Sequence, residues 1–453
     1  MQTQARFSVT ASIAAILAIS WLIVLSSIPG IQWNAGQVKN DKYMARSSIE
    51  PSTLLGSSDQ NGDEWPMFRG ALNHSGSVLT TPVQNTSKLW SSKIGNDLGT
   101  SSPTVVGGRL YIGSYESKIY CIDANTGVPI WNYRTRNITY MDRFVTSSPA
   151  FADGRLYVGS DDKNLYCLDA ATGTSIWNYT TSGYVSSPAV SGGCVYVGSS
   201  DNKTYCLNAI TGTSIWNFTT SSWIGSSPAV VQGRVYFGGG DHGVYCLNAT
   251  TGALIWKYTT GSPVSSSPAV AGGRLCVGSE DKNIYCLNAI TGGLYWSYTT
   301  GGAVMSSPAI ANERVYVVGN DHKIYCIDLF SGSSRWTWKY SLSSEPLDSS
   351  VAIAGGRMYA TIGMRQIFCI NATNGISLWT YDADGYVLSS PTVAGGRVYV
   401  GCLNGVVYCL PMIYDPPQPD YTSILVIFII LGSVIGLCAL ILFIKEKRLS
   451  WKK

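Results

Sequence analysis

One unit of about forty residues recurs eight times along this chain of 453 residues. Each copy reads Ser-Ser-Pro, an apolar stretch, Gly-Arg, an alternating Val-Tyr-Val-Gly run, an acidic turn, Tyr-Cys-Leu, Thr-Gly and a tryptophan. The repeated cysteines are Cys121, Cys167, Cys206, Cys246, Cys286, Cys326, Cys369 and Cys409. In the first seven copies a glycine follows six residues after the cysteine, and a tryptophan follows four residues after the glycine. Such constant spacing predicts an array of equal supersecondary units.

Each unit is expected to form four antiparallel strands, here named A to D in chain order. Strand A contains Ser-Pro-Ala-Val, and its proline is compatible only with an edge strand. A Gly-Gly turn leads to strand B, an acidic turn to strand C, and a Thr-Gly turn to strand D, which carries the tryptophan. A single sheet of this kind cannot bury both faces, whereas sheets stacked in a ring can. We therefore predict an all-β fold, an eight-bladed β-propeller.

The repeat count predicts how the ring closes. The eighth copy stops after Cys409 and has no tryptophan strand of its own, while Leu89-Trp90 precedes the first Ser-Ser-Pro. We expect Trp90 to lie in the same sheet as Tyr408 and Cys409, so that an N-terminal strand completes the last blade. The structural tryptophans are then Trp90, Trp131, Trp177, Trp216, Trp256, Trp296, Trp336 and Trp379, each packed on the next blade.

The repeated cysteines and acids are expected to be structural. Equivalent positions in neighbouring blades lie about 10 Å apart, whereas a disulfide needs Cα atoms within about 7 Å. Only three histidines are present and no Cys-x-x-Cys pair occurs, so we predict no metal site. The pattern leaves open a bridge involving Cys194, Cys276 or Cys402, for example with Cys286. The acids five residues before the cysteines belong to the B–C turns, where aspartate bonds its own backbone. No catalytic motif is found in a usable context.

Two apolar segments flank the repeats. The first, about 9–28, resembles a signal peptide but is long enough to span a bilayer, so cleavage stays open. The second, 423–444, is uncharged, and a basic tail at 445–453 follows it, which places that tail in the cytoplasm by the positive-inside rule. The expected organisation is signal peptide or helix 1–31, flexible linker 32–63, propeller 64–411, proline-rich stalk 412–422, membrane helix 423–444 and tail 445–453.

The predicted localisation is the cell membrane, with one or two spans and the propeller outside. Eight Asn-x-Ser/Thr sequons are compatible with an exported glycoprotein. The net charge of +4 is small for this length, so no nucleic-acid partner is expected.

Two motifs resemble the pyrroloquinoline-quinone (PQQ) repeat family of propellers, which is also similar to WD40 and YVTN-like repeat proteins in architecture. They are the segments 168–177, Leu-Asp-Ala-Ala-Thr-Gly-Thr-Ser-Ile-Trp, and 65–70, Trp-Pro-Met-Phe-Arg-Gly. That family contains quinoprotein dehydrogenases, which use PQQ and calcium, and non-enzymatic members such as the assembly lipoprotein BamB and cell-surface proteins. The dehydrogenases carry a vicinal Cys-Cys pair and a Glu/Asn/Asp calcium set, which find no match here. The resemblance thus implies a non-catalytic surface scaffold without cofactor, with a PQQ-dependent oxidoreductase as the alternative.

Loop lengths single out one face of the ring for binding. The D–A loops and B–C turns share that face, and most D–A connections have 10 residues from the tryptophan to the next Ser-Ser. The first-to-second junction has 16 and the sixth-to-seventh has 13, and the seventh copy replaces its turn acid. Binding to a surface protein or a glycan is therefore expected at Arg134, Arg136, Tyr140, Asp142, Arg143, Phe144, Trp338, Lys339, Glu345, Asp348, Met364 and Arg365.

Overall fold

The computed structural model describes residues 64–78, 80, 84–85, 87–136, 144–340, 349–362 and 365–414. The predicted signal segment, linker, stalk, membrane helix and tail lie outside this range, apart from the first residues of the stalk. Every regular element within it is a strand, and no helix there is long and apolar enough to cross a membrane.

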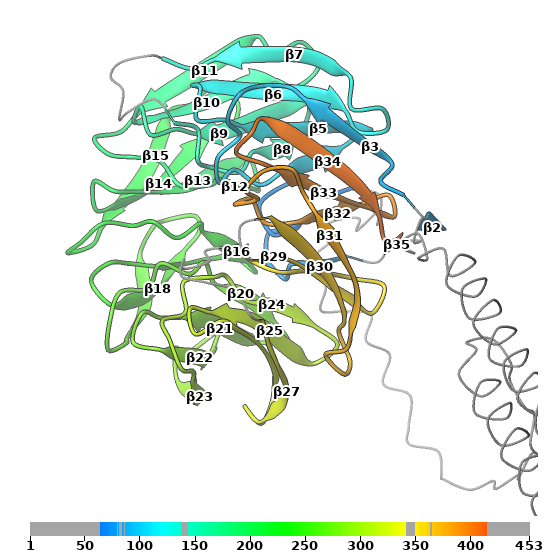
Figure 1. Ribbon diagram of the computed structural model, residues 1–453. Coiled ribbons are helices and arrows are strands. Elements are labelled where there is room, and N and C mark those ends of the chain that lie inside the picture. Colours follow the sequence, from blue (N-terminus) through cyan, green and yellow to red (C-terminus); the bar gives the residue numbers. More distant parts are fainter. Residues whose placement is uncertain are drawn as a thin grey trace, which may run out of the picture. The chain divides into compact units, whose positions relative to one another are not determined.

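Eight blades of four antiparallel strands each form a propeller, as predicted, and the seventh blade gains the short strand β1 (Ser77–Val78) as a fifth, parallel strand. Neighbouring A strands contact one another all the way around the ring (Figure 1). The A strands are β4 (Thr104–Val106), β8 (Ala150–Ala152), β12 (Ala189–Ser191), β16 (Ala229–Val231), β20 (Ala269–Ala271), β24 (Ala309–Ala311), β28 (Ala352–Ala354) and β32 (Thr392–Ala394). The B strands are β5 (Arg109–Gly113), β9 (Arg155–Gly159), β13 (Cys194–Ser199), β17 (Arg234–Gly238), β21 (Arg274–Gly278), β25 (Arg314–Gly319), β29 (Arg357–Ile362) and β33 (Arg397–Gly401). The proline expected inside strand A precedes it instead, so its missing N–H removes no hydrogen bond between strands of the sheet.

The outer half of each blade consists of the C and D strands. The C strands are β6 (Lys118–Asp123), β10 (Asn164–Asp169), β14 (Lys203–Asn208), β18 (Gly243–Asn248), β22 (Asn283–Asn288), β26 (Lys323–Asp328), β30 (Gln366–Asn371) and β34 (Val406–Pro411). The D strands are β7 (Pro129–Arg134), β11 (Ser175–Thr180), β15 (Ser214–Thr219), β19 (Leu254–Thr259), β23 (Leu294–Thr299), β27 (Ser334–Lys339), β31 (Ser377–Asp382) and β3 (Trp90–Lys93). Three short strands complete the set: β1 (Ser77–Val78), β2 (Gln84–Asn85) and β35 (Ile413–Tyr414).

The ring closes as the repeat count predicts. Strand β3 pairs antiparallel with β34, and Trp90 lies opposite Cys409. Figure 1 shows these two strands side by side, although they come from opposite ends of the described chain. Strand β32 of the same blade contacts β4 of the first blade, so that no blade face is left at an end of the array.

Each repeated tryptophan contacts the next blade, as Trp131 illustrates. The Trp131 indole N–H donates to the Ala170 carbonyl at 3.2 Å, and the Tyr111 hydroxyl of the same blade donates to that carbonyl at 3.2 Å. The indole also covers Gly173 of the next blade, where an added Cβ would lie 2.6 Å from the ring. Because Gly173 has a φ of 76°, its position demands both a left-handed conformation and the absence of a side chain.

The repeated cysteines are buried between the blades as free thiols. Cys276 faces Cys286 across the β21–β22 pair, and both are free, as are Cys194 and Cys402. Cys276 takes the place of the B-strand tyrosine, for instance Tyr236 in the preceding blade. Within the described chain the cysteines therefore act as small apolar residues, as expected.

A single N-terminal segment, residues 65–78, runs along the free edges of the A strands inside the ring. Its carbonyls accept the amide hydrogens of residues in the first, second, fourth, fifth, sixth and seventh blades. These amides belong to Val105, Phe151, Val230, Val270, Ile310 and Ile353. The segment therefore supplies the partners that the inner edge strands would otherwise lack.

Candidate binding face

The D–A loops and B–C turns meet on one face of the ring, here called the D–A face. The carbonyls of Phe144, Tyr184 and Trp223, in three successive D–A loops, accept backbone hydrogen bonds from the B–C turns of the following blades. The A–B and C–D turns meet on the opposite face, where the Ala170 amide donates to the Gly154 carbonyl at 2.9 Å. The division into two faces that the strand order predicts is confirmed.

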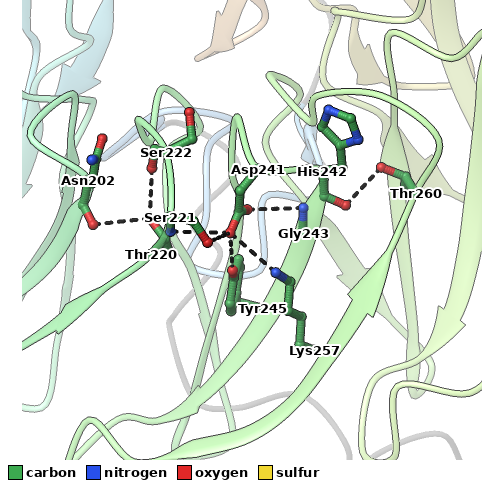
Figure 2. Close-up of polar contacts among 10 residues, drawn as sticks. All are labelled: Asn202, Thr220, Ser221, Ser222, Asp241, His242, Gly243, Tyr245, Lys257 and Thr260. Atoms are coloured by element: carbon green, nitrogen blue, oxygen red, sulfur yellow. Dashed lines mark hydrogen bonds and ion pairs between the residues drawn. The ribbon is translucent and has the colours of Figure 1, made fainter.

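In five blades an acidic side chain on the D–A face connects the B–C turn to the loop beside it, and Figure 2 shows the example of Asp241. Its Oδ1 accepts the Gly243 amide at 3.2 Å, which closes its own turn. Its Oδ2 accepts the Tyr245 hydroxyl, the Lys257 ammonium at 3.2 Å and the Ser221 hydroxyl at 3.2 Å. Burial by itself raises the pKa of Asp241, but the hydrogen bonds from Tyr245 and Lys257 outweigh it and lower that pKa overall.

The same acid–tyrosine contact recurs around the ring. The pairs are Glu116–Tyr120 at 3.0 Å, Asp162–Tyr166 at 2.6 Å, Asp201–Tyr205 at 2.8 Å, Asp281–Tyr285 at 2.7 Å and Asp321–Tyr325 at 2.5 Å. In the eighth blade Tyr408 bonds Asp384 at 3.0 Å, and in the seventh Phe368 replaces the tyrosine. Asp162, Asp201, Asp241 and Asp281 thus accept an amide hydrogen of their own turn, as predicted. Asp201, Asp281 and Asp321 also bond the loop beside them, as Asp241 does.

A circle of serines, which the sequence reasoning missed, surrounds the axis. The amide of the second serine in one Ser-Ser pair donates to the hydroxyl of the second serine in the next blade. Seven such bonds of 2.8–3.0 Å run in the same direction: Ser102 to Ser148, Ser148 to Ser187, Ser227 to Ser267, Ser267 to Ser307, Ser307 to Ser350, Ser350 to Ser390 and Ser390 to Ser102. The invariant position of this serine within the repeat was the available signal.

The residues predicted to bind a partner divide into three groups. Tyr140, Asp142, Arg143, Glu345, Asp348 and Met364 lie outside the described residues. Arg136, Phe144 and Arg365 belong to loops and turns of the D–A face, where the Phe144 ring lies 4.6 Å from that of Tyr115. Arg134, Trp338 and Lys339 were expected in loops, but the structure places them at the ends of strands β7 and β27.

Trp338 occupies a repeated packing position rather than a loop. In six other blades the residue two positions after the D-strand tryptophan is a tyrosine or phenylalanine that packs on the C-strand tyrosine of the next blade, as Tyr298 packs on Tyr325. Trp338 packs in the same way on Phe368, with ring centroids 5.1 Å apart. The seventh blade has Phe368 where other C strands have a tyrosine, and the larger indole of Trp338 matches this replacement. Packing between blades therefore accounts for this side chain.

One repeat position on the D–A face carries exposed aromatic side chains. Tyr184, Trp223 and Tyr386 are equivalent residues of three loops and are 44%, 38% and 44% exposed. The Arg365 guanidinium lies over the Tyr386 ring, 5.4 Å from its centroid. Pro263 and Ala303 fill this position in two other blades. The signal was an aromatic residue seven positions after the D-strand tryptophan.

The described residues do not fit PQQ with calcium. No three His, Cys, Asp or Glu side chains in that part of the chain converge as metal ligands, and the six turn acids lie in six different blades, each bonded to a tyrosine. The sequence contains no adjacent cysteines. Inside the ring, the Arg69 guanidinium donates to the Pro308 and Val351 carbonyls, and burial lowers its pKa from 12.5 to about 9.

Known structures share this fold at low sequence identity. BamB from Moraxella catarrhalis matches with a TM-score of 0.61 and 17% identity, over 71% of this chain and 96% of that chain. Quinohemoprotein alcohol dehydrogenase ADHIIG from Pseudomonas putida HK5 matches with a TM-score of 0.66 and 16% identity, over 80% and 83% of the two chains. The corresponding enzyme from Comamonas testosteroni gives 0.63 and 14%, over 79% and 82%. At these identities the likeness concerns the fold alone.

The repeats themselves identify the family. No curated protein matches the sequence. The family model described as outer membrane protein assembly factor BamB matches five overlapping stretches, 75–185, 138–261, 207–284, 240–343 and 323–410, which together span nearly all of the propeller. This chain therefore belongs to the BamB-like family of PQQ-repeat β-propellers.

Proposed function

We propose that this protein is a non-catalytic scaffold, anchored in the cell membrane, whose D–A face binds a surface protein or a glycan outside the cell. The observation that carries the proposal is the row of half-exposed aromatic residues at one loop position. Tyr184 and Trp223 occupy this position in adjacent loops, and backbone hydrogen bonds from the B–C turns of the following blades hold both loops. Aromatic side chains of this kind contribute large contact areas at a low cost in conformational entropy.

The anchor is proposed from the sequence. Residues 423–444 are uncharged and long enough to cross a bilayer, and five of the nine residues that follow are Lys or Arg. The eight sequons agree with an extracytoplasmic propeller.

The test uses the full chain in detergent, with partners captured from intact cells and from an array of glycans. We expect the triple variant Arg136→Ala, Tyr184→Ala and Trp223→Ala to lose its specific partner or glycan at least tenfold, because each good aromatic anchor contributes on the order of 2 kcal/mol. The control variant Ile176→Ala, Ile215→Ala and Ile255→Ala removes similarly exposed side chains from outer strands. Equal capture by the two variants would refute the proposed face.

The alternative is a PQQ-dependent oxidoreductase, which the fold likeness to quinohemoprotein dehydrogenases supports. The turn acids argue against it, because each is already bonded within its own blade. Adding PQQ and calcium to the purified chain separates the two proposals. A quinone absorbance that survives desalting would favour the enzyme, whereas its loss would favour the scaffold.

A further inference from the structure

We propose that the face formed by the A–B and C–D turns, here called the C–D face, lies against the lipid surface of the membrane that anchors the chain. The inference rests on the proposed membrane anchor and adds an orientation to it. Three observations carry it: where exposed apolar side chains gather, where arginines lie, and where the described chain ends.

Exposed apolar side chains gather at the C–D face. Of the sixteen large apolar side chains that are exposed in the described chain, thirteen lie in C–D turns or in the first two residues of D strands. Those in turns are Val128, Ile210, Ile290, Phe330 and Ile376, and those in strands are Ile130, Ile176, Ile215, Leu254, Ile255, Leu294, Tyr295 and Leu378. The other three are the aromatic residues of the D–A face. Soluble surfaces seldom concentrate apolar residues in this way without a partner.

The D strands change polarity along their length. Strand β11 begins with exposed Ser175 and Ile176 at the C–D face and continues with exposed Asn178 and Thr180 toward the D–A face. Strand β15 repeats this order with Ile215, Asn217 and Thr219. An exposed apolar residue lies in the first two positions of six D strands: β7, β11, β15, β19, β23 and β31. A gradient along the propeller axis that recurs in six blades suits a planar boundary between an apolar and an aqueous phase better than a partner bound at one side.

Arginines lie beside the thirteen exposed apolar side chains of the C–D face, which are here called the apolar band. Seven B strands begin with a half-buried arginine at the C–D face: Arg109, Arg155, Arg234, Arg274, Arg314, Arg357 and Arg397. The Arg274 guanidinium lies over the rings of Tyr295 and Phe330, 4.0 and 4.9 Å from their centroids, and both rings belong to the band. A cation held beside exposed apolar side chains suits the region where lipid phosphates meet acyl chains.

Both ends of the described chain lie at the same face. The Glu64 carboxylate accepts the amide of Gly107 in an A–B turn at 3.3 Å. Strand β34 runs toward the C–D face, and β35 ends at Tyr414. Only eight residues separate Tyr414 from Ser423, a reach of roughly 30 Å when fully extended. A D strand of six residues spans about 20 Å, so most of this reach would be used along the height of the ring before the D–A face could meet the membrane, whereas the C–D face lies where the tether begins.

The test places a fluorescent label in the full chain reconstituted into vesicles that contain anionic lipid. The variant Ile290→Cys carries an NBD group in the apolar band, and Ile210→Cys provides a second band position. Tyr184→Cys carries the same group on the D–A face, and wild-type chain treated with the same reagent gives the background from native cysteines. We expect emission from both band positions to shift to shorter wavelength and to be quenched several-fold more by nitroxide-labelled lipids than emission from the D–A position.

The outcomes separate the orientation from the anchor. If the chain stays with the membranes after alkaline carbonate extraction, but band and D–A labels are quenched alike, the orientation is refuted and the anchor stands. If carbonate releases the chain, the anchor fails, and the proposed orientation fails with it. Retention together with selective quenching of the band positions supports both.

Discussion

At the scale of residues, the glycine of each Thr-Gly turn meets two separate demands. Gly173 and Gly154 both belong to the second blade and have φ angles of 76° and 72°. An added Cβ at Gly154 would meet nothing within 4 Å, whereas at Gly173 it would lie 2.6 Å from the Trp131 ring. The pair therefore separates the cost of a left-handed backbone from the cost of displacing the indole.

We expect Gly154→Ala to lower the free energy of unfolding by about 1 kcal/mol, from backbone strain alone. Gly173→Ala should lower it by roughly 3 kcal/mol, since overpacking adds to that strain. Urea denaturation measures both. In a Trp131→Ala background the cost of Gly173→Ala should fall to that of Gly154→Ala. An unchanged cost in that background would show that the indole contact is not the cause.

At the scale of elements, the closing strand β3 differs from every other D strand. Strand β15 follows its neighbour β14 directly along the chain, whereas β3 and its neighbour β34 come from opposite ends of the described chain. Strand β3 is therefore held in its blade only by its pairing with β34 and by its own packing. The Trp90 indole donates to the Ala124 carbonyl at 3.2 Å, as the Trp216 indole donates to the Ala249 carbonyl at 3.0 Å. The two tryptophans make equivalent contacts at topologically different places.

We expect Trp90→Ala and Trp216→Ala to reduce the free energy of unfolding by similar amounts, roughly 3 kcal/mol each. Only Trp90→Ala should also release a strand, because loss of β3 requires no other blade to unfold. Limited proteolysis under native conditions should then cut the Trp90→Ala chain near β3 and leave the Trp216→Ala chain intact. Light scattering should show association through the exposed edge of β34. Identical cleavage of the two variants would contradict this role of β3.

The sequence predicts the strands and their order better than it predicts the contacts between blades and the positions of residues in the loops. The number of blades, the strand order and the closure by Trp90 follow from the repeat, because every copy has the same local pattern of residues. The serine circle could not be read from one copy, since its bonds form only between blades. Trp338 was misplaced because counting from the tryptophan to Ser-Ser includes the end of a D strand. The exposed position of Tyr184 and Trp223 escaped because loop length was compared, and these loops have ordinary lengths.

At the scale of the whole molecule, residues 65–78 connect blades that are far apart in the sequence. Their carbonyls bond the A strands of six blades, and two of their side chains lie deep inside the ring. Arg69 is 3% exposed and His74 is 1% exposed. The Nδ1 atom of His74 has no hydrogen-bond partner among the described residues. A buried imidazole beside a buried guanidinium must stay neutral for the ring to stay folded.

This requirement makes the stability of the ring depend on pH. Burial, reinforced by the positive charge of Arg69, lowers the pKa of His74 from 6.5 to about 3. Above pH 6.5 the imidazole is neutral in both the folded and the unfolded chain, so it costs nothing. Below pH 6.5 only the unfolded chain takes up the proton, and the free energy of unfolding should fall by up to about 1.4 kcal/mol per pH unit, until the pH approaches 3.

The variant His74→Gln should remove this dependence between pH 6.5 and 4.5, because a glutamine can still donate to the Pro268 carbonyl that His74 contacts but cannot be protonated. His242→Gln is the matched control, since His242 lies in a B–C turn on the D–A face. Urea denaturation at half-unit steps of pH measures the slope for all three chains. Asp241 does not obscure the result, because with its lowered pKa it loses its contribution only below about pH 4. Equal slopes for wild type and His74→Gln between pH 6.5 and 4.5 would show that His74 becomes protonated within the folded ring, and the interior around Arg69 would then have to be open to water.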